Sequence, residues 1–130
     1  MEGNVPQDRA LVVDDHEDTL EMLAMLLRRS GYVVETASSA FEALDFYKAG
    51  DSFCLIISDI GMPRMNGYEL ARKLRQMPQC KTTLMVAVTG FSAYDDRRRA
   101  LESGFDELVT KPIGPVSFLA SIARLRSKKK

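Results

Sequence analysis

The sequence predicts an α/β fold in which five short strands alternate with five helices, a (βα)5 pattern. Two observations carry this prediction. The apolar runs at residues 11–13 and 84–88 do not alternate with polar residues, which is typical of strands buried on both faces of a parallel sheet. Between such runs, apolar residues recur at helical spacing. Right-handed crossovers then place helices on both faces of the sheet and give a three-layer sandwich.

The first half of the chain contains three predicted strands and two predicted helices. Apolar runs place the strands at residues 11–13, 32–36 and 53–58. The apolar stripe of the first helix is formed by Leu20, Leu23, Ala24 and Leu27, and that of the second by Ala40, Ala43, Leu44 and Tyr47. Gly31 and Gly50 follow the two stripes at the position where a left-handed residue ends a helix.

The second half continues the alternation with three helices and two strands. The strands are predicted at residues 83–88 and 105–110. The stripe of the third helix is formed by Gly67, Leu70, Ala71 and Leu74, and that of the last helix by Phe118, Ile122 and Leu125. Pro78 ends the third helix, and Pro115 suits the first position of the last one. Ser92 and Asp95 predict a capping box for the fourth helix, which Gly104 ends.

Composition and charge narrow the class of protein. We expect one domain over residues 9–126, with a flexible N-terminal segment at residues 1–8 and a basic tail at residues 127–130. A net charge of zero and the lack of any run of about 20 apolar residues argue against nucleic-acid and membrane contact. Two unpaired cysteines and no signal pattern favour the cytoplasm. The arginine run at residues 97–99 is expected to be a solvated helix face.

Polar side chains suited to phosphate chemistry follow four of the five strands. Asp14 and Asp15 follow the first strand, and Asp59 follows the third. Thr89 follows the fourth strand and Lys111 the fifth. The carboxyl ends of parallel strands share one edge of a sheet, and open α/β sheets bind ligands at that edge. We therefore expect these five side chains to lie close together.

Three carboxylates at one edge favour a bound cation, because two like charges about 4 Å apart repel by about 4 kcal/mol at an effective dielectric constant of 20. Oxygen ligands favour Mg²⁺, and a single histidine with no useful cysteine pair argues against a zinc site. Asp59 stands alone on the central strand and is the predicted nucleophile toward a phosphoryl group. Asp15 is the predicted direct metal ligand, and Asp14 helps directly or through water. The alternative for an Asp-Asp pair before a helix is an N-cap.

Four segments around the strand ends stand out, namely Leu-Val-Val-Asp14-Asp15, Ser-Asp59-Ile-Gly-Met-Pro63-Arg-Met-Asn-Gly67, Val-Ala-Val-Thr89-Gly90 and Val-Thr-Lys111-Pro112. Together they resemble the signature segments of CheY-like receiver domains of response regulators. The resemblance covers about residues 9–126. It implies a flavodoxin-like fold with strand order 2-1-3-4-5.

The resemblance also implies roles for the residues at the strand ends. Asp59 would accept a phosphoryl group from a phosphohistidine on a histidine kinase or histidine phosphotransfer protein. Mg²⁺, for which Mn²⁺ can substitute, would be held by Asp15, Asp59 and the backbone carbonyl of Gly61. Thr89 would turn toward the phosphoryl group and Lys111 would pair with it. Such a domain switches contacts with a downstream protein target and is not a turnover enzyme by itself.

One position departs from the family pattern. Many receivers carry Tyr or Phe three residues before the lysine, whereas this chain has Leu108. The segments around Asp59 and the arginine run resemble the subgroup attached to hybrid sensor histidine kinases. The chain is therefore expected to be either a stand-alone regulator or the receiver segment of such a kinase.

The residues expected to take part in switching or docking surround the strand ends. Gly90 offers an accessible backbone N–H beside Thr89, and Pro112 can turn the chain through a cis bond. A kinase-docking surface is expected near His16, Leu20, Ile113 and Pro115. For His16 we favour an exposed residue that a partner touches over a catalytic role.

Three other functions share parts of this pattern. A phosphohydrolase of the haloacid-dehalogenase type needs a second Asp two residues after the nucleophile, and Gly61 stands there. A pseudo-receiver would lack an acid, the threonine or the lysine, and none is missing. A flavin or nucleotide carrier would carry a glycine-rich loop after the first strand, which this sequence lacks.

Overall fold

The computed structural model describes residues 8–90 and 94–129. Its elements, in chain order, are β1 (Arg9–Val13), α1 (Glu17–Arg29), β2 (Val33–Ala37), α2 (Ala40–Lys48), β3 (Leu55–Asp59), α3 (Gly67–Arg75), the short 3-10 helix η2 (Pro78–Cys80), β4 (Leu84–Thr89), α4 (Tyr94–Ser103), β5 (Glu107–Thr110) and α5 (Pro115–Lys129). The five strands form one parallel sheet in the order β2-β1-β3-β4-β5. The predicted (βα)5 pattern and strand order are confirmed.

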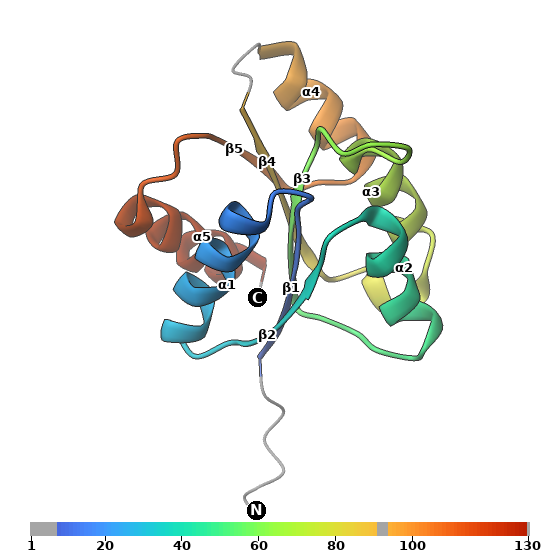
Figure 1. Cartoon of the computed structure of the whole chain (residues 1–130), viewed down its shortest axis with the longest axis horizontal. Coiled ribbons are helices and arrows are strands. Elements are labelled where there is room, and N and C mark those ends of the chain that lie inside the picture. The colour runs from blue at the N-terminus through green and yellow to red at the C-terminus, as the bar shows by residue number, and fades with distance from the viewer. Residues whose placement is uncertain (1–7, 91–93, 130) are drawn as a thin grey trace, which may run out of the picture.

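Helices cover both faces of the sheet (Figure 1), and each face has its own apolar core. Successive residues of a strand point to opposite faces. Leu11 and Val13 of β1 therefore pack toward α2, α3 and α4, whereas Ala10 and Val12 pack toward α1 and α5. This two-sided burial explains why the strand sequences show no polar alternation.

Three strands extend further toward their carboxyl ends than the sequence indicates. Asp59 pairs with Val88, and Thr89 pairs with Thr110, so both functional candidates are the last residues of strands rather than residues beyond them. β2 likewise ends at Ala37 instead of residue 36. The difference arises because ladder pairing continues through polar residues, which an apolar run cannot reveal.

β5 is shorter than predicted and begins at Glu107 instead of residue 105. The Phe105 N–H donates to the carbonyl of Ala100 at the end of α4, and the Asp106 N–H donates to the Met85 carbonyl. Phe105 thus completes the turn after the helix, and Asp106 contacts β4 just before the paired residues of β5 begin. Phe105 itself is buried in the core.

The helix ends largely follow the predicted chemistry. Gly31, Gly50 and Gly104 all have positive φ angles after their helices, as expected for left-handed terminating residues. α3 begins with a capping box in which Asn66 and Glu69 exchange hydrogen bonds. The capping box predicted at Ser92 lies outside the described residues.

The ends of the domain differ from the expected boundaries in one respect. Arg126 of α5 pairs with Asp8 just before β1, with 2.9 Å between the nearest nitrogen and oxygen atoms. α5 continues through Lys129, so the tail expected from residue 127 is helical to that point. Its serine and lysine residues carry no helix-stopping chemistry such as Gly or Pro. Within the described residues, no helix has the length and apolar character needed to span a membrane.

Gly67, the first residue of α3, lies in very close contact with the backbone at the end of β3. A Cβ atom at this position would lie 2.4 Å from the backbone oxygen of Asp59 and 2.8 Å from the Cα atom of Ile60. The Gly67 N–H also donates to the Ile60 carbonyl over 2.9 Å. Only a residue without a side chain lets the start of α3 lie against the end of β3.

We expect Gly67→Ala to lower the free energy of unfolding by about 1–3 kcal/mol, because a methyl group must displace backbone atoms that hold Asp59. Urea unfolding followed by circular dichroism measures the change. Gly90→Ala is the matched control, since among the described residues no atom lies within 4 Å of its added Cβ. Equal stability of the Gly67→Ala and Gly90→Ala variants would contradict the close contact.

Candidate functional site

The predicted site residues converge at the carboxyl edge of the sheet. Asp14 follows β1, Asp59 ends β3 and Thr89 ends β4. Lys111 follows β5, and its Nζ atom lies 3.7 Å from Asp14 Oδ2 and 3.7 Å from Asp59 Oδ1. One ammonium group therefore bridges two carboxylates that come from neighbouring strands.

The two adjacent aspartates occupy different environments. Asp14 is completely buried, and its Oδ1 atom accepts a hydrogen bond of 2.8 Å from the His16 N–H. The Asp14 N–H donates to the Ala37 carbonyl and so fixes the residue against the end of β2. Asp15 is exposed. The N-cap of α1 is His16, which makes no side-chain cap bond, so the N-cap explanation of the pair is wrong.

Asp59 is a buried carboxyl group in an unfavourable electrostatic position. Burial raises its pKa above the ordinary value of 3.8, and the nearby Asp14 carboxylate raises it further. The Lys111 ammonium and a hydrogen bond from the Ile60 N–H oppose this shift, while Asp15 adds to it. The net rise means that the protein holds an ionised Asp59 at a cost, and a cation bound beside it would relieve that cost.

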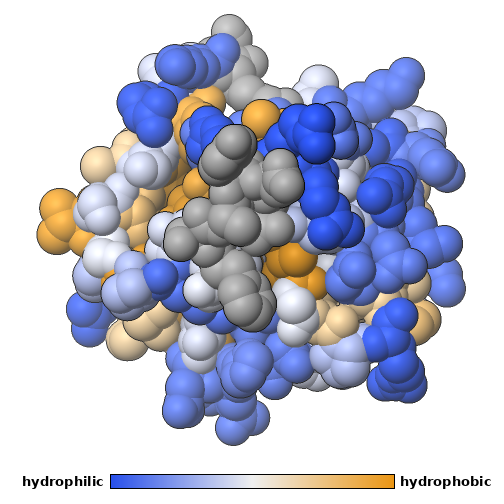
Figure 2. Space-filling view, turned by 90° about the horizontal axis from the view of Figure 1, so that it is seen from above, coloured by the Kyte–Doolittle hydropathy of each residue, from blue (hydrophilic) through white to orange (hydrophobic). Residues whose placement is uncertain are grey.

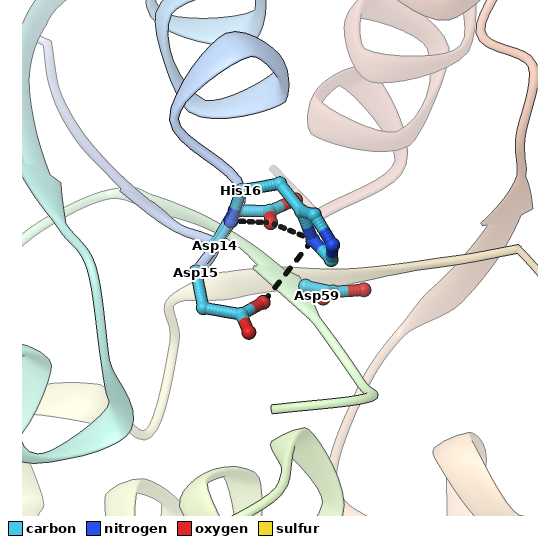
Figure 3. A group of neighbouring side chains, drawn as sticks. All are labelled: Asp14, Asp15, His16 and Asp59. Carbon is cyan, nitrogen blue, oxygen red and sulfur yellow. Dashed lines mark hydrogen bonds and ion pairs between the residues drawn. The ribbon is translucent and has the colours of Figure 1, made fainter. Parts of the chain in front are cut away.

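The acidic cluster offers the ligand atoms that a cation needs. Asp14, Asp15, His16 and Asp59 each offer one ligand atom, and these four atoms lie within 4.8 Å of one another (Figure 3). The buried Oδ2 atom of Asp14 accepts no hydrogen bond from any residue that the structure describes. A buried carboxylate oxygen without a donor is costly unless a cation satisfies it, so these residues fit a divalent ion.

A hollow of about 300 Å³ opens beside Asp59 and gives a ligand access to its carboxylate. Its lining includes five predicted residues besides Asp59, namely His16, Gly61, Thr89, Gly90 and Lys111. Figure 2 looks onto this edge of the molecule from above. Apolar side chains lie mostly on the side of α1 and α5, and hydrophilic side chains lie on the side of α3. The hollow thus places the Asp59 carboxylate beside the Lys111 ammonium.

Three residues that line the hollow are not among the predicted ones. They are Ile60, Tyr68 and Arg99, and the Arg99 guanidinium lies 4.4 Å from the centre of the Tyr68 ring. Arg97 of the same run pairs with Glu107 of β5. All three arginines are exposed, as expected for a solvated helix face, and two of them also link α4 to α3 and to the sheet. The arginine run is visible in the sequence, but the Tyr68 ring that Arg99 packs on lies far away in the sequence, so the contact is not.

Some of the residues predicted for switching and docking are exposed, whereas others are partly buried. The Lys111–Pro112 peptide bond is cis, and Pro112 and Pro115 are exposed. Leu108 packs partly buried against the core beside α4, and Ile113 packs against the α1–α5 core.

Leu20 does not suit its predicted place on a docking surface. It is buried in the core between α1 and α5, because it belongs to the apolar stripe that faces the sheet. A partner would instead meet exposed neighbours such as His16 on the same helix end.

We expect Asp59→Asn to unfold at a higher urea concentration than the wild type at pH 7 in chelator-treated buffer. The raised pKa of Asp59 means that its ionised form destabilises the fold above that pKa. This cost fades as the pH falls through the raised pKa of the folded state and disappears below 3.8, where the folded and unfolded states both bind the proton. The stability difference between the variants should therefore shrink on acidification. A constant or inverted difference between pH 7 and pH 4 would contradict the raised pKa.

Comparison with known proteins agrees with this geometry. Residues 10–123 match the family model described as the response regulator receiver domain. A 14.6 kDa protein encoded in the sodA1 3′ region of Leptolyngbya boryana is 38% identical over 109 residues, which cover 84% of this chain and 82% of that protein.

Two further relatives are kinases. The sensor histidine kinase RcsC of Salmonella typhimurium is 36% identical over 103 residues, which cover 79% of this chain but only 10% of the kinase. The receiver domain of a signal transduction histidine kinase from Syntrophus aciditrophicus has a solved structure with a TM-score of 0.82 and 35% identity, covering 93% of this chain and 91% of that one. The chain belongs to the receiver-domain family of the response regulators of two-component signalling.

Proposed function

We propose that this chain is a phosphoaccepting receiver in which Asp59 takes a phosphoryl group from the phosphohistidine of a histidine kinase or histidine phosphotransfer protein. The observation that carries the proposal is the position of the Asp59 carboxylate. It lies at the open hollow, 3.7 Å from the Lys111 ammonium and beside the buried Asp14. A nucleophile, a fixed cation and a cation-binding cluster are the parts that phosphoryl transfer requires.

The transfer itself needs little from the protein beyond position and charge. An Asp59 carboxylate oxygen forms a bond to phosphorus, and the bond from phosphorus to the donor's imidazole nitrogen breaks. The electron pair of that bond stays on the donor nitrogen. Lys111 offsets the charge on the phosphoryl oxygens, and the Thr89 hydroxyl at the end of β4 can donate a hydrogen bond to one of them.

The acidic cluster would hold Mg²⁺, for which Mn²⁺ can substitute. Asp15, Asp59 and the backbone carbonyl of Gly61 would be its ligands, and Asp14 would act directly or through water. When bound, the ion supplies positive charge that screens the incoming phosphate from the carboxylates. The Oδ2 atom of Asp14 supports this assignment, because it accepts no hydrogen bond from the described residues and has the Lys111 ammonium only at 3.7 Å.

The phosphoryl group would change how this end of the molecule meets other proteins. It adds negative charge to a hollow whose walls come from β3, β4, α3 and α4. Because Leu108 stands where many relatives carry an aromatic ring, the response is expected to pass through Thr89, Gly90 and the start of α4. Exposed His16 and Pro115 are the expected contacts for a kinase.

We place the domain in the cytoplasm, with protein partners rather than nucleic acid or membrane. Two free cysteines support a reducing compartment. The match to a small part of a hybrid-type kinase and to most of a 14.6 kDa protein is compatible with both a receiver segment and a stand-alone regulator. In either setting the chain modifies itself once and does not turn over a substrate.

We expect acetyl phosphate with Mg²⁺ to add one phosphoryl group to the chain, as measured by intact-protein mass spectrometry. Asp59→Asn should add none, because the nucleophilic oxygen is lost. Asp45→Asn, an exposed aspartate on α2, is the matched control and should label like the wild type. Equal labelling of the Asp59→Asn variant would refute the assignment of the acceptor.

Excess chelator should stop this labelling without a change in the circular dichroism spectrum, because the apolar core on both faces of the sheet does not involve the acidic cluster. Labelling that persists in chelator would exclude the role of the divalent ion.

A further inference from the structure

The hollow beside Asp59 is lined by a second cation, the guanidinium of Arg99 on α4. This group lies 4.4 Å from the centre of the Tyr68 ring, which belongs to α3 and is only 5% exposed. α3 and α4 pack against each other on one face of the sheet (Figure 1). A cation over an aromatic face is attracted by the ring, so Tyr68 gives the long arginine side chain a preferred position at the hollow.

The three arginines of the run differ in their surroundings. Arg97 forms an ion pair with Glu107, and Arg98 is not among the residues that the structure places around the hollow. Arg99 lines the hollow and forms neither an ion pair nor a side-chain hydrogen bond with any described residue. Its positive charge is therefore available to an anion that enters the hollow.

The other cation of the hollow is already shared. The Lys111 ammonium lies 3.7 Å from the Asp14 carboxylate and 3.7 Å from the Asp59 carboxylate. A phosphoryl group on a protein carries a further charge of about −1.5 to −2 at neutral pH, which one shared ammonium cannot match. A guanidinium suits this ligand, because its planar fork of N–H donors can bind two phosphate oxygens at once.

We propose that Arg99 binds the phosphoryl group on Asp59 as a second cation beside Lys111, while the Tyr68 ring positions its guanidinium. This assignment rests on the proposed function for the identity of the ligand, and it adds a phosphate-binding residue from α4. Because Arg99 belongs to that helix, the contact connects the phosphorylated site directly to α4. The connection does not require an aromatic side chain at the position of Leu108.

A free anion tests the contact without any covalent transfer. We would titrate inorganic phosphate into the full chain carrying Asp59→Asn, with Mg²⁺ present and at constant ionic strength, because this variant cannot be phosphorylated on Asp59. Nitrogen-15 spectra follow the arginine Nε resonances, and Arg99→Lys, which lacks Nε, identifies the resonance of Arg99. We expect this resonance to shift and to saturate with phosphate. Phosphate binding that leaves the Arg99 resonance unchanged would overturn the proposal.

Affinities of charge-matched variants complete the test. In the same background, Arg99→Gln should weaken phosphate binding about fivefold or more, because charge-assisted hydrogen bonds are lost. Arg99→Lys should recover only part of the affinity, since an ammonium lacks the planar fork. Arg98→Gln removes the same charge from the next position of the helix and should change the affinity less than about twofold. Equal affinities of the Arg99→Gln and Arg98→Gln variants would also overturn the proposal.

The two proposals can fail separately, because acetyl phosphate labelling requires Asp59 and the phosphate titration does not. If labelling of the wild type fails but phosphate binding depends on Arg99, the acceptor assignment is wrong and Arg99 remains a phosphate ligand of the hollow. If Asp59 is labelled but Arg99→Gln binds phosphate as tightly as the control, the receiver function stands and the role of Arg99 is wrong.

Discussion

The repulsion between Asp14 and Asp59 is the constraint on which the rest of this site depends. Parallel pairing of β1 with β3 brings the two carboxyl groups to the same edge, and burial denies them water. Lys111 lies 3.7 Å from each and supplies one positive charge for two carboxylates. The surrounding fold holds this arrangement, since Gly67 locks the end of β3 and the Ala37 carbonyl locks Asp14. The excess negative charge makes the site receptive to a cation, and a bound cation would screen an incoming phosphoryl group from the carboxylates.

The sequence predicts the architecture well because strands that are buried on both faces consist mostly of apolar residues. Every strand of the sheet coincides with an apolar run, and the strand order follows from the family resemblance. Strand ends were displaced by one or two residues, since ladder hydrogen bonds continue into Asp59 and Thr89 without any change in hydropathy. The convergence of acids and lysine was likewise predictable, because it follows from parallel topology alone.

What the sequence could not reveal depends on contacts between distant segments. Arg99 lies over Tyr68, a residue of another helix, and no local pattern encodes that pairing. Leu20 was expected on a docking surface, but the stripe that it belongs to faces the core. The orientation of His16 toward the carboxylates is also a three-dimensional fact, because an imidazole at a helix start can equally point to solvent.

The most direct test of the central claim is a crystal structure of the chain with Mg²⁺ and beryllofluoride, a mimic of the phosphoryl group. The account predicts beryllium bonded to a carboxylate oxygen of Asp59, the metal ion held by the acidic cluster, and fluorine atoms in contact with Lys111 and Thr89. Beryllofluoride bound to another carboxylate, or a metal ion located away from Asp15 and Asp59, would contradict it.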